Sequence, residues 1–259
     1  MWPAINLGPF VLPTAALTYL LGAWLLLSVT ERVARQLDQD AEVYTNLVTA
    51  GLIVGFVGAR LTFVLLFWPA YQNNLLSIVW PLNAGFSPAG GVIFGAAALF
   101  FYGRYKQLPL AASLDILAPI MVSALMVVSV ADFVGGPGYG TTANVPWAID
   151  QFGVPRHPVQ IYELLVGAAA LLAWWALRRR RAYAGQLFLV TASVYCFGRL
   201  FVDAFRADTP LVAGGWHLVQ ILCLAVVLTS LVLLARHAST GDLAAPAQDA
   251  GDAGKAELS

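Results

Sequence analysis

Residues 185–206 read GQLFLVTASVYCFGRLFVDAFR. An apolar run of about 20 residues is long enough to cross a bilayer as a helix. This run nevertheless carries Tyr195, Arg199, Asp203 and Arg206, whose i, i+4, i+8, i+11 spacing places them on one helical face. Because a charge in hydrocarbon is costly and often marks a substrate path, the run predicts a membrane helix with a functional polar face.

The composition of the whole chain agrees with a membrane protein. Of its 259 residues, 59% are hydrophobic and 11% are charged, and the mean hydropathy is +0.75. Soluble domains carry about 25% charged residues. The formal net charge is zero, so we expect no nucleic-acid partner. Cys196 and Cys223 lie in apolar runs with neither a disulfide framework nor metal-ligand spacing, so we expect no metal and no cofactor.

The apolar segments predict an all-α bundle of seven transmembrane helices, since lipid cannot satisfy an open backbone edge. The expected spans are 10–30, 43–69, 88–104, 109–134, 158–177, 185–206 and 215–235. The stretch 83–91, NAGFSPAGG, is rich in turn formers and predicts a loop, either external or re-entrant. We expect residues 1–238 to form one domain and residues 239–259, which offer little bulk, to form a disordered cytoplasmic tail.

Basic residues predict the orientation of these spans. They follow the odd-numbered spans, as Arg32, Arg35, Arg104, Lys106, Arg178 to Arg181, Arg236 and Lys255. After the even-numbered spans the basic residues are few, and Arg156 and Arg206 are among them. By the positive-inside rule the odd junctions face the cytoplasm, so we expect the N-terminus outside and the C-terminus inside.

With this orientation, charged residues of several spans fall near the outer leaflet. Asp132, Glu163 and Arg199 come from three different spans, and Arg60 lies past the midplane of a fourth. The planar fork of arginine suits bidentate binding of phosphate, which predicts an anionic headgroup at this depth. The alternative, a structural pair of Arg199 with Asp203 that locks two helices, stays open.

The segment PRHPVQIYELL, residues 155–165, opens the fifth expected span with a polar turn. The exposed N–H groups of a helix N-terminus favour an anion, and Pro158 fits the first helical position. An interfacial cap with solvated charges is the alternative interpretation. The polar residues of this turn are Arg156, His157, Gln160, Tyr162 and Glu163.

These motifs resemble the bacterial prolipoprotein diacylglyceryl transferase family. The segment 155–165 is close to the family's P-R-H-P-[ST]-Q-[LI]-Y-E block, and 199–206 is similar to its R-x-x-x-E-x-x-R pattern with Asp203 in place of Glu. Gly58-Ala59-Arg60 resembles the family's G-[GA]-R. SLDILAPI at 113–120 and VQIL at 219–222 resemble further segments, in the same order along the chain.

The resemblance implies a multi-pass enzyme of the bacterial plasma (inner) membrane. It would move diacylglyceryl from phosphatidylglycerol to the lipobox cysteine of a prolipoprotein signal peptide at the outer leaflet, leaving glycerol phosphate. Its partners would be these two substrates and the membrane lipids. We expect catalytic roles for Arg199, Asp203, Asp132 and His157. We expect substrate binding by Arg60, Arg156, Gln160, Tyr162, Glu163, Tyr195 and Arg206.

Several positions depart from the family pattern. Ala89 stands where the family's S-F-H-G-G loop has histidine, Ser129 stands for an arginine, and Pro137 stands for a glutamate. Asp132 replaces an asparagine, and Ala15 aligns with a first-span tyrosine. The usual candidate for the catalytic base is therefore absent.

Three hypotheses follow from these departures. The first is a divergent transferase that uses another base, with Asp132, His157 and Asp203 as candidates. The second is a non-catalytic relative that binds lipid or a lipoprotein precursor. The third is a related transferase with a different lipid donor or acceptor.

Overall fold

The structure is a computed structural model that describes residues 4–7, 10–79, 85–208, 211–212 and 216–243. The chain divides into two compact units, Met1–Thr18 with Met121–Ser259 and Tyr19–Ile120, which are described separately here. Within the described residues, six helices are long and apolar enough to cross a membrane. They are α1 (Thr14–Gln36), α2 (Ala41–Leu66), α6 (Leu110–Gly135), α7 (Val159–Leu177), α8 (Gln186–Val202), whose span runs on to Phe205, and α9 (Leu218–Leu243), whose span ends at Ala238.

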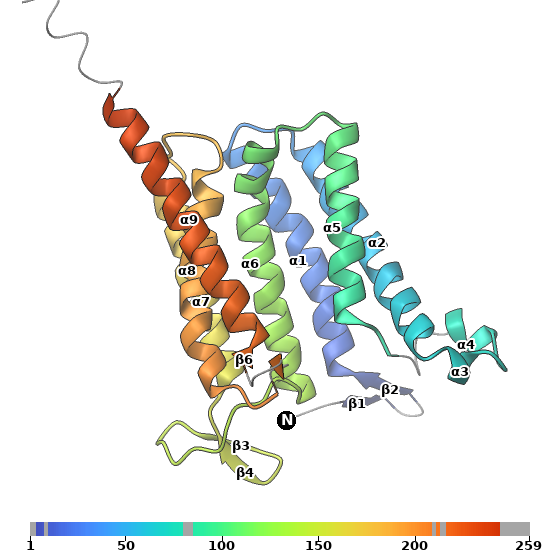
Figure 1. Ribbon diagram of the computed structural model, residues 1–259. Coiled ribbons are helices and arrows are strands. Elements are labelled where there is room, and N and C mark those ends of the chain that lie inside the picture. The colour runs from blue at the N-terminus through green and yellow to red at the C-terminus, as the bar shows by residue number, and fades with distance from the viewer. Residues whose placement is uncertain (1–3, 8–9, 80–84, 209–210, 213–215, 244–259) are drawn as a thin grey trace, which may run out of the picture. The chain divides into compact units, whose positions relative to one another are not determined.

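In the first unit, α8 packs between two neighbouring helices. It contacts α7 on one side and α9 on the other, and the three run side by side in Figure 1. A 3₁₀ turn, η1 (Asp203–Phe205), continues α8 at its C-terminal end. The second half of α6 also belongs to this unit and carries Ser129 and Asp132.

Three short antiparallel sheets accompany the helices of the first unit, and the sequence did not predict them. They pair β1 (Ala4–Leu7) with β2 (Phe10–Pro13), β3 (Ile149–Gln151) with β4 (Val154–Arg156), and β5 (Leu211–Val212) with β6 (Trp216–His217). The β3–β4 hairpin turns through Phe152 and Gly153, both with positive φ. Two successive positive φ angles suit the twist of a tight hairpin.

In the second unit, α2 and α5 (Pro88–Tyr105) form the most extensive helix pair, with short helices α3 (Trp68–Tyr71) and α4 (Leu76–Val79) in the connection (Figure 1). The pair is close because small residues face each other. A Cβ atom added at Gly55 would lie 3.1 Å from the carbonyl oxygen of Gly91. Small residues allow this approach of two backbones inside lipid, where close packing drives helix association.

Several expected boundaries were wrong, among them the end of the first span, expected at residue 30, since α1 continues to Gln36 and includes Arg32 and Arg35. The first expected span began at residue 10, but Phe10–Pro13 is strand β2 and the helix begins at Thr14. The expected loop 83–91 overlaps α5, whose first turn is Pro88 to Gly91. The Ser87 hydroxyl accepts a 3.3 Å hydrogen bond from the Gly90 N–H, and Pro88 occupies the first turn. A serine cap followed by proline starts a helix even where glycines follow.

The remaining expected spans have helical counterparts. The span 88–104 forms α5, which stands outside the group of six membrane-length helices. At the C-terminus, α9 continues to Leu243, and the rest of the expected disordered tail, from residue 244, lies outside the described residues. The part 83–84 of the expected loop also lies outside them.

Candidate functional site

Glu163, in the first two turns of α7, is the centre of the site. Its side chain is buried, and its Oε1 accepts hydrogen bonds from Nη1 of Arg199 and Nη1 of Arg206. Its Oε2 accepts a 2.6 Å hydrogen bond from the hydroxyl of Ser129 on α6. One carboxylate therefore joins α6, α7 and the C-terminal end of α8, and both of its oxygens are satisfied, as a buried charge requires.

Arg206 extends this network toward the loop that follows α6. Its Nε donates a 2.8 Å hydrogen bond to Asp208, and its Nη2 lies 3.7 Å from Oδ2 of Asp132. Asp208 in turn accepts a 2.9 Å hydrogen bond from the Gly138 N–H. Gly138 has φ +70°, and a Cβ added there would lie 2.8 Å from Asp132 and 2.9 Å from Arg206. Only glycine lets the loop backbone cross the ion pair at this distance.

Asp203 extends the network in the other direction. It is fully buried, and its Oδ1 lies 3.6 Å from Nη2 of Arg199. Its Oδ2 lies 3.1 Å from Nδ1 of His217, the last residue of β6, directly before α9. We call Asp132, Glu163, Arg199, Asp203, Arg206 and Asp208 the charge cluster. It contains two guanidinium groups and four carboxylates.

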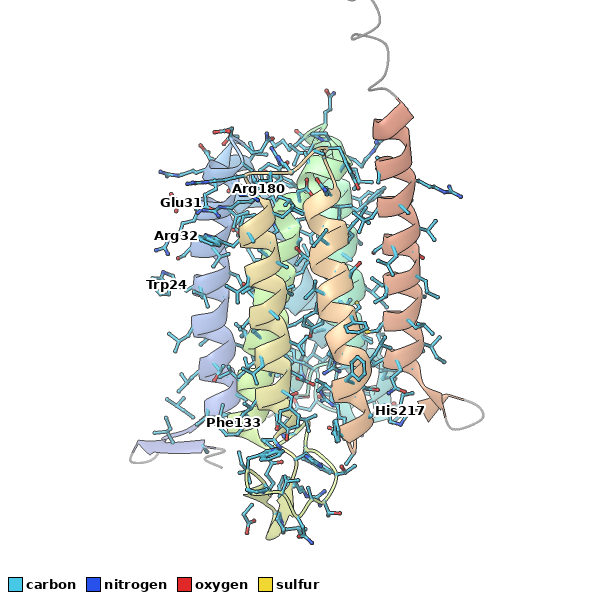
Figure 2. All side chains as sticks on the ribbon, turned by 90° about the vertical axis from the view of Figure 1, so that its left-hand side faces the viewer. Trp24, Glu31, Arg32, Phe133, Arg180 and His217 are labelled. Carbon is cyan, nitrogen blue, oxygen red and sulfur yellow. The ribbon has the colours of Figure 1, made fainter. Side chains whose placement is uncertain are left out.

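Sequence reasoning missed His217 and Asp208. The first is a lone histidine at the edge of the last apolar run, and the second lies in a loop. A signal for His217 was present, since it stands three residues before Gln220 in the segment that resembles the family. Figure 2 shows His217 at the same end of the helices as Phe133, and Arg180 at the opposite end.

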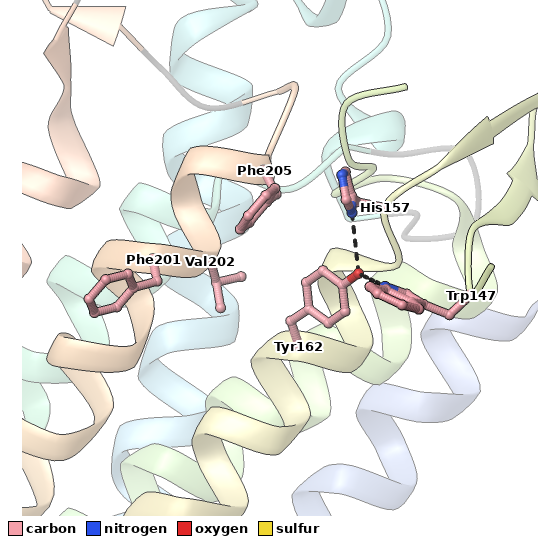
Figure 3. A pocket seen from close by; sticks show the side chains of 6 residues that line it. All are labelled: Trp147, His157, Tyr162, Phe201, Val202 and Phe205. Atoms are coloured by element: carbon pink, nitrogen blue, oxygen red, sulfur yellow. Dashed lines mark hydrogen bonds between the residues drawn. The ribbon is translucent and has the colours of Figure 1, made fainter. Parts of the chain in front are cut away.

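His157 and Tyr162 line a separate apolar cavity of about 480 Å³ (Figure 3). The Tyr162 hydroxyl accepts a 2.7 Å hydrogen bond from Nε1 of Trp147 and lies 3.2 Å from Nδ1 of His157. The other lining residues are Phe201, Val202 and Phe205. Residues of the cavity and of the charge cluster are neighbours in the sequence: Tyr162 directly precedes Glu163, and Phe205 directly precedes Arg206.

Gln160 and Arg156 both bond to the loop that follows α6. Gln160 is fully buried and donates a 3.1 Å hydrogen bond to the Pro137 carbonyl. Arg156 donates to the carbonyls of Gly140, at 3.0 Å, and Gln151, at 3.4 Å, and its guanidinium lies 4.8 Å from the centre of the Tyr139 ring. In the structure both side chains hold the loop 137–140.

Arg60 lies in the second unit and is bonded to neutral oxygens there. It donates to the carbonyls of Ile78 (2.9 Å), Gly85 (3.0 Å) and Ser77 (2.5 Å), and to the Tyr71 hydroxyl at 3.3 Å. The guanidinium is thus buried without an acidic partner among these contacts. Four oxygen acceptors replace its hydration shell.

The structure brings together five of the residues that the sequence singled out for this region. Asp132, Glu163, Arg199, Asp203 and Arg206 form one network of ion pairs. The structural Arg199–Asp203 pair is present, but as part of this larger network. Tyr195 is half-buried one turn before Arg199 on α8. Outside the network, Arg156 and Gln160 bond the loop 137–140, and His157 and Tyr162 line the cavity.

The membrane-length helices and the buried charge cluster define a multi-pass helical membrane protein with a polar site built by α6, α7 and α8. A sequence model of the family described as "Prolipoprotein diacylglyceryl transferase" matches residues 3–236. The chain belongs to this family.

Individual relatives agree over nearly the whole chain. The phosphatidylglycerol–prolipoprotein diacylglyceryl transferase of Solidesulfovibrio magneticus is 32% identical over 250 residues, which cover 91% of this chain and 94% of that protein. The proteins of the same name from Oleidesulfovibrio alaskensis and Methylococcus capsulatus are 32% and 31% identical, with 89% and 90% of this chain covered. The matched regions span 91% and 93% of these two relatives.

Proposed function

We propose that this protein transfers the diacylglyceryl group of phosphatidylglycerol to the lipobox cysteine of prolipoproteins, at the outer leaflet of the bacterial plasma membrane. The observation that carries this proposal is the double contact of Glu163. It belongs to the segment 155–165 and accepts hydrogen bonds from Arg199 and Arg206 of the motif 199–206. The two motifs that resemble the family most closely therefore meet in one polar site.

The topology that suits this function has seven spans, namely the six membrane-length helices and α5. It places the N-terminus outside and the C-terminus inside. Basic residues between α7 and α8 support it, because Arg180 lies at the opposite end of these helices from His217 (Figure 2). With Arg180 in the cytoplasm, the charge cluster faces the outer leaflet, where a lipobox cysteine arrives.

In this proposal, Arg206 and Arg199 stabilise the phosphate that departs from the lipid. Arg206 is the more accessible of the two, with 17% of its side chain exposed against 11% for Arg199. Their partner carboxylates outnumber them, so an incoming phosphate must share or displace the hydrogen bonds that Glu163 now accepts. Charged donors in a site with little water stabilise charge that develops on a leaving oxygen.

The neighbouring residues shape the substrate site. The cavity beside His157 and Tyr162 is lined by apolar side chains and suits an acyl chain or the apolar core of a signal peptide. Arg156 and Gln160 act through the loop 137–140 that they hold. Tyr195, one turn before Arg199, extends the polar face, and Arg60 holds Tyr71, Ser77, Ile78 and Gly85 of the second unit.

A non-catalytic relative is the second candidate, and Ala89 and Ser129 are the observations that favour it. Ser129 remains within the network, because its hydroxyl bonds Glu163. Ala89 stands in place of the family histidine, so another residue must act as the base. The sequence indicates Asp132, His157 and Asp203 as candidates for this role.

Complementation tests the proposal directly. The full chain is expressed in a bacterium depleted of its own diacylglyceryl transferase, and growth and lipoprotein modification are followed. The purified protein is then given phosphatidylglycerol and a lipobox peptide, and the thioether product is measured by mass. Product from phosphatidylglycerol supports the proposal, and no product despite correct folding favours the non-catalytic relative. Product from another phospholipid alone identifies a transferase with a different donor.

A further inference from the structure

A carboxylate–imidazole pair lies at the edge of the charge cluster. Oδ2 of Asp203 and Nδ1 of His217 are 3.1 Å apart. Asp203 is fully buried, whereas 30% of the His217 side chain is exposed. The carboxylate is therefore enclosed while the imidazole is accessible from outside. A purely structural contact does not need this difference in exposure.

The hydrogen bond determines which ring nitrogen is available. An ionised Asp203 accepts a hydrogen bond, so Nδ1 of His217 carries the proton and Nε2 keeps its lone pair. The charged groups that face this pair are Arg199, at 3.6 Å from the other oxygen of Asp203, and Glu163 beyond it. Arg199 supplies the positive charge beside Asp203.

The other candidate bases are less suitably placed. Of the three histidines in the sequence, His157 shares its Nδ1 with the Tyr162 hydroxyl, and His237 bonds the Leu233 carbonyl of its own helix. Among the described residues, His217 is the one histidine paired with a carboxylate. Oδ2 of Asp132 is engaged in the ion pair with the guanidinium of Arg206, at 3.7 Å.

We infer that His217 is the general base that deprotonates the lipobox cysteine, with Asp203 as the residue that positions it; this inference rests on the proposed function. In the reaction, Nε2 of His217 takes the S–H proton. The thiolate sulfur forms a bond to the glyceryl carbon next to the phosphate, and the bond from that carbon to the phosphate oxygen breaks with its electron pair on oxygen. The products are the thioether and glycerol phosphate, and the imidazolium returns its proton to the phosphate or to water.

The informative variant is His217→Asn. The asparagine amide nitrogen occupies about the position of Nδ1, so it can still donate to Asp203, but it has no basic atom. Because general bases contribute about 10²–10⁴-fold, we expect kcat to fall by about 100-fold or more with KM for phosphatidylglycerol unchanged. His237→Asn, on the exposed part of α9, is the matched control and should retain activity.

A nucleophile that is already ionised separates a base from a structural residue. A selenocysteine lipobox peptide carries a selenol, which is ionised at neutral pH and needs no base. His217→Asn should therefore lose much less activity with this peptide than with the cysteine peptide, after subtraction of the uncatalysed rate.

Asp203→Asn tests the positioning role. It keeps an oxygen for the Nδ1 hydrogen bond but removes the charge, so the cysteine reaction should slow while the selenocysteine reaction is largely spared. Full activity of His217→Asn with the cysteine peptide would overturn the inference and leave the proposed function intact. Equal loss with both peptides would also overturn it, in favour of a structural role. A folded wild-type protein that gives no product with either peptide would refute the proposed function itself, and the inference with it.

Discussion

The hydroxyl of Ser129 donates a 2.6 Å hydrogen bond to Oε2 of Glu163. The family resemblance expects an arginine at this position of α6, and the structure has a neutral hydroxyl there. The positive charges around Glu163 come instead from Arg199 and Arg206, at the C-terminal end of α8. Glu163 is thus held in place without a cation from α6.

Ser129→Ala should weaken the site without dismantling it. The change leaves one buried carboxylate oxygen without a donor, which costs about 1–3 kcal/mol. We expect a lower unfolding temperature in detergent and a several-fold lower kcat/KM for phosphatidylglycerol. Ser28→Ala is the control, because the Ser28 hydroxyl bonds only a carbonyl of its own helix in the described contacts. If both variants behave alike, Glu163 does not depend on Ser129.

Arg199→Ala should abolish function, whereas Arg104→Ala should not. Arg199 is buried between Glu163 and Asp203, so its removal leaves carboxylates uncompensated and costs about 3–5 kcal/mol. Arg104 lies in the last turn of α5, outside the charge cluster. Activity is compared only at equal amounts of folded protein, measured by gel filtration in detergent.

Arg199→Lys separates charge from geometry. An ammonium keeps the charge but cannot reproduce the planar fork, so we expect impaired turnover even where the variant folds normally. Full activity of Arg199→Ala in folded protein would disprove the role of Arg199 in holding phosphate. Full activity of Arg199→Lys would show that charge alone is sufficient.

The proposed orientation places Gln36 and Asn144 on opposite sides of the membrane. In a background with Cys196→Ser and Cys223→Ala, single cysteines at these exposed positions are labelled with an impermeant maleimide. Asn144→Cys should react in intact spheroplasts, and Gln36→Cys should react only after permeabilisation, because positive loops stay in the cytoplasm. Labelling of both from the same side would contradict the topology.

Restoring the family residues tests whether catalysis has been lost. Ala89→His alone should change the activity little, because Ser129 and Pro137 also depart from the family pattern. An active wild type is expected in the thioether assay. A silent wild type together with clear product from the variant Ala89→His, Ser129→Arg, Pro137→Glu would support a scaffold that has lost its activity. Loss of product in folded Asp132→Asn would favour Asp132 as the base over His217.

The sequence predicted the parts of the site that regular helices control. The spacing of Arg199, Asp203 and Arg206 predicted one helical face, but α8 ends at Val202, Asp203 lies in η1, and Arg206 follows it with an extended backbone. The three residues nevertheless join one network, and apolar length located α7 and α8 to within a few residues. The spacing could not show that Glu163, rather than a bound anion, is the shared partner of Arg199 and Arg206, because packing between helices decides which groups meet.

Other features left little signal in the sequence. The partners of Arg60 are mostly backbone carbonyls. Every residue carries a carbonyl, so the residue types in the sequence could not indicate which ones bind Arg60. The β3–β4 hairpin depends on a positive φ at Phe152, which is unusual for an aromatic residue. Asp203 lies in η1 and His217 in β6, so spacing along one helix could not reveal that their side chains meet.

The partners of Arg60 also set an order of events during synthesis. Its four acceptors lie 11 to 25 residues later in the chain, so they leave the ribosome after α2 itself. If α2 inserts before they follow, its guanidinium enters without these acceptors, at a cost of up to about 2.5–3.5 kcal/mol. Its mean hydropathy of 1.9 offsets this cost. Tyr71, Ser77, Ile78 and Gly85 then supply the acceptors of the guanidinium, so the order of translation, and not only final stability, bears on the sequence around Arg60.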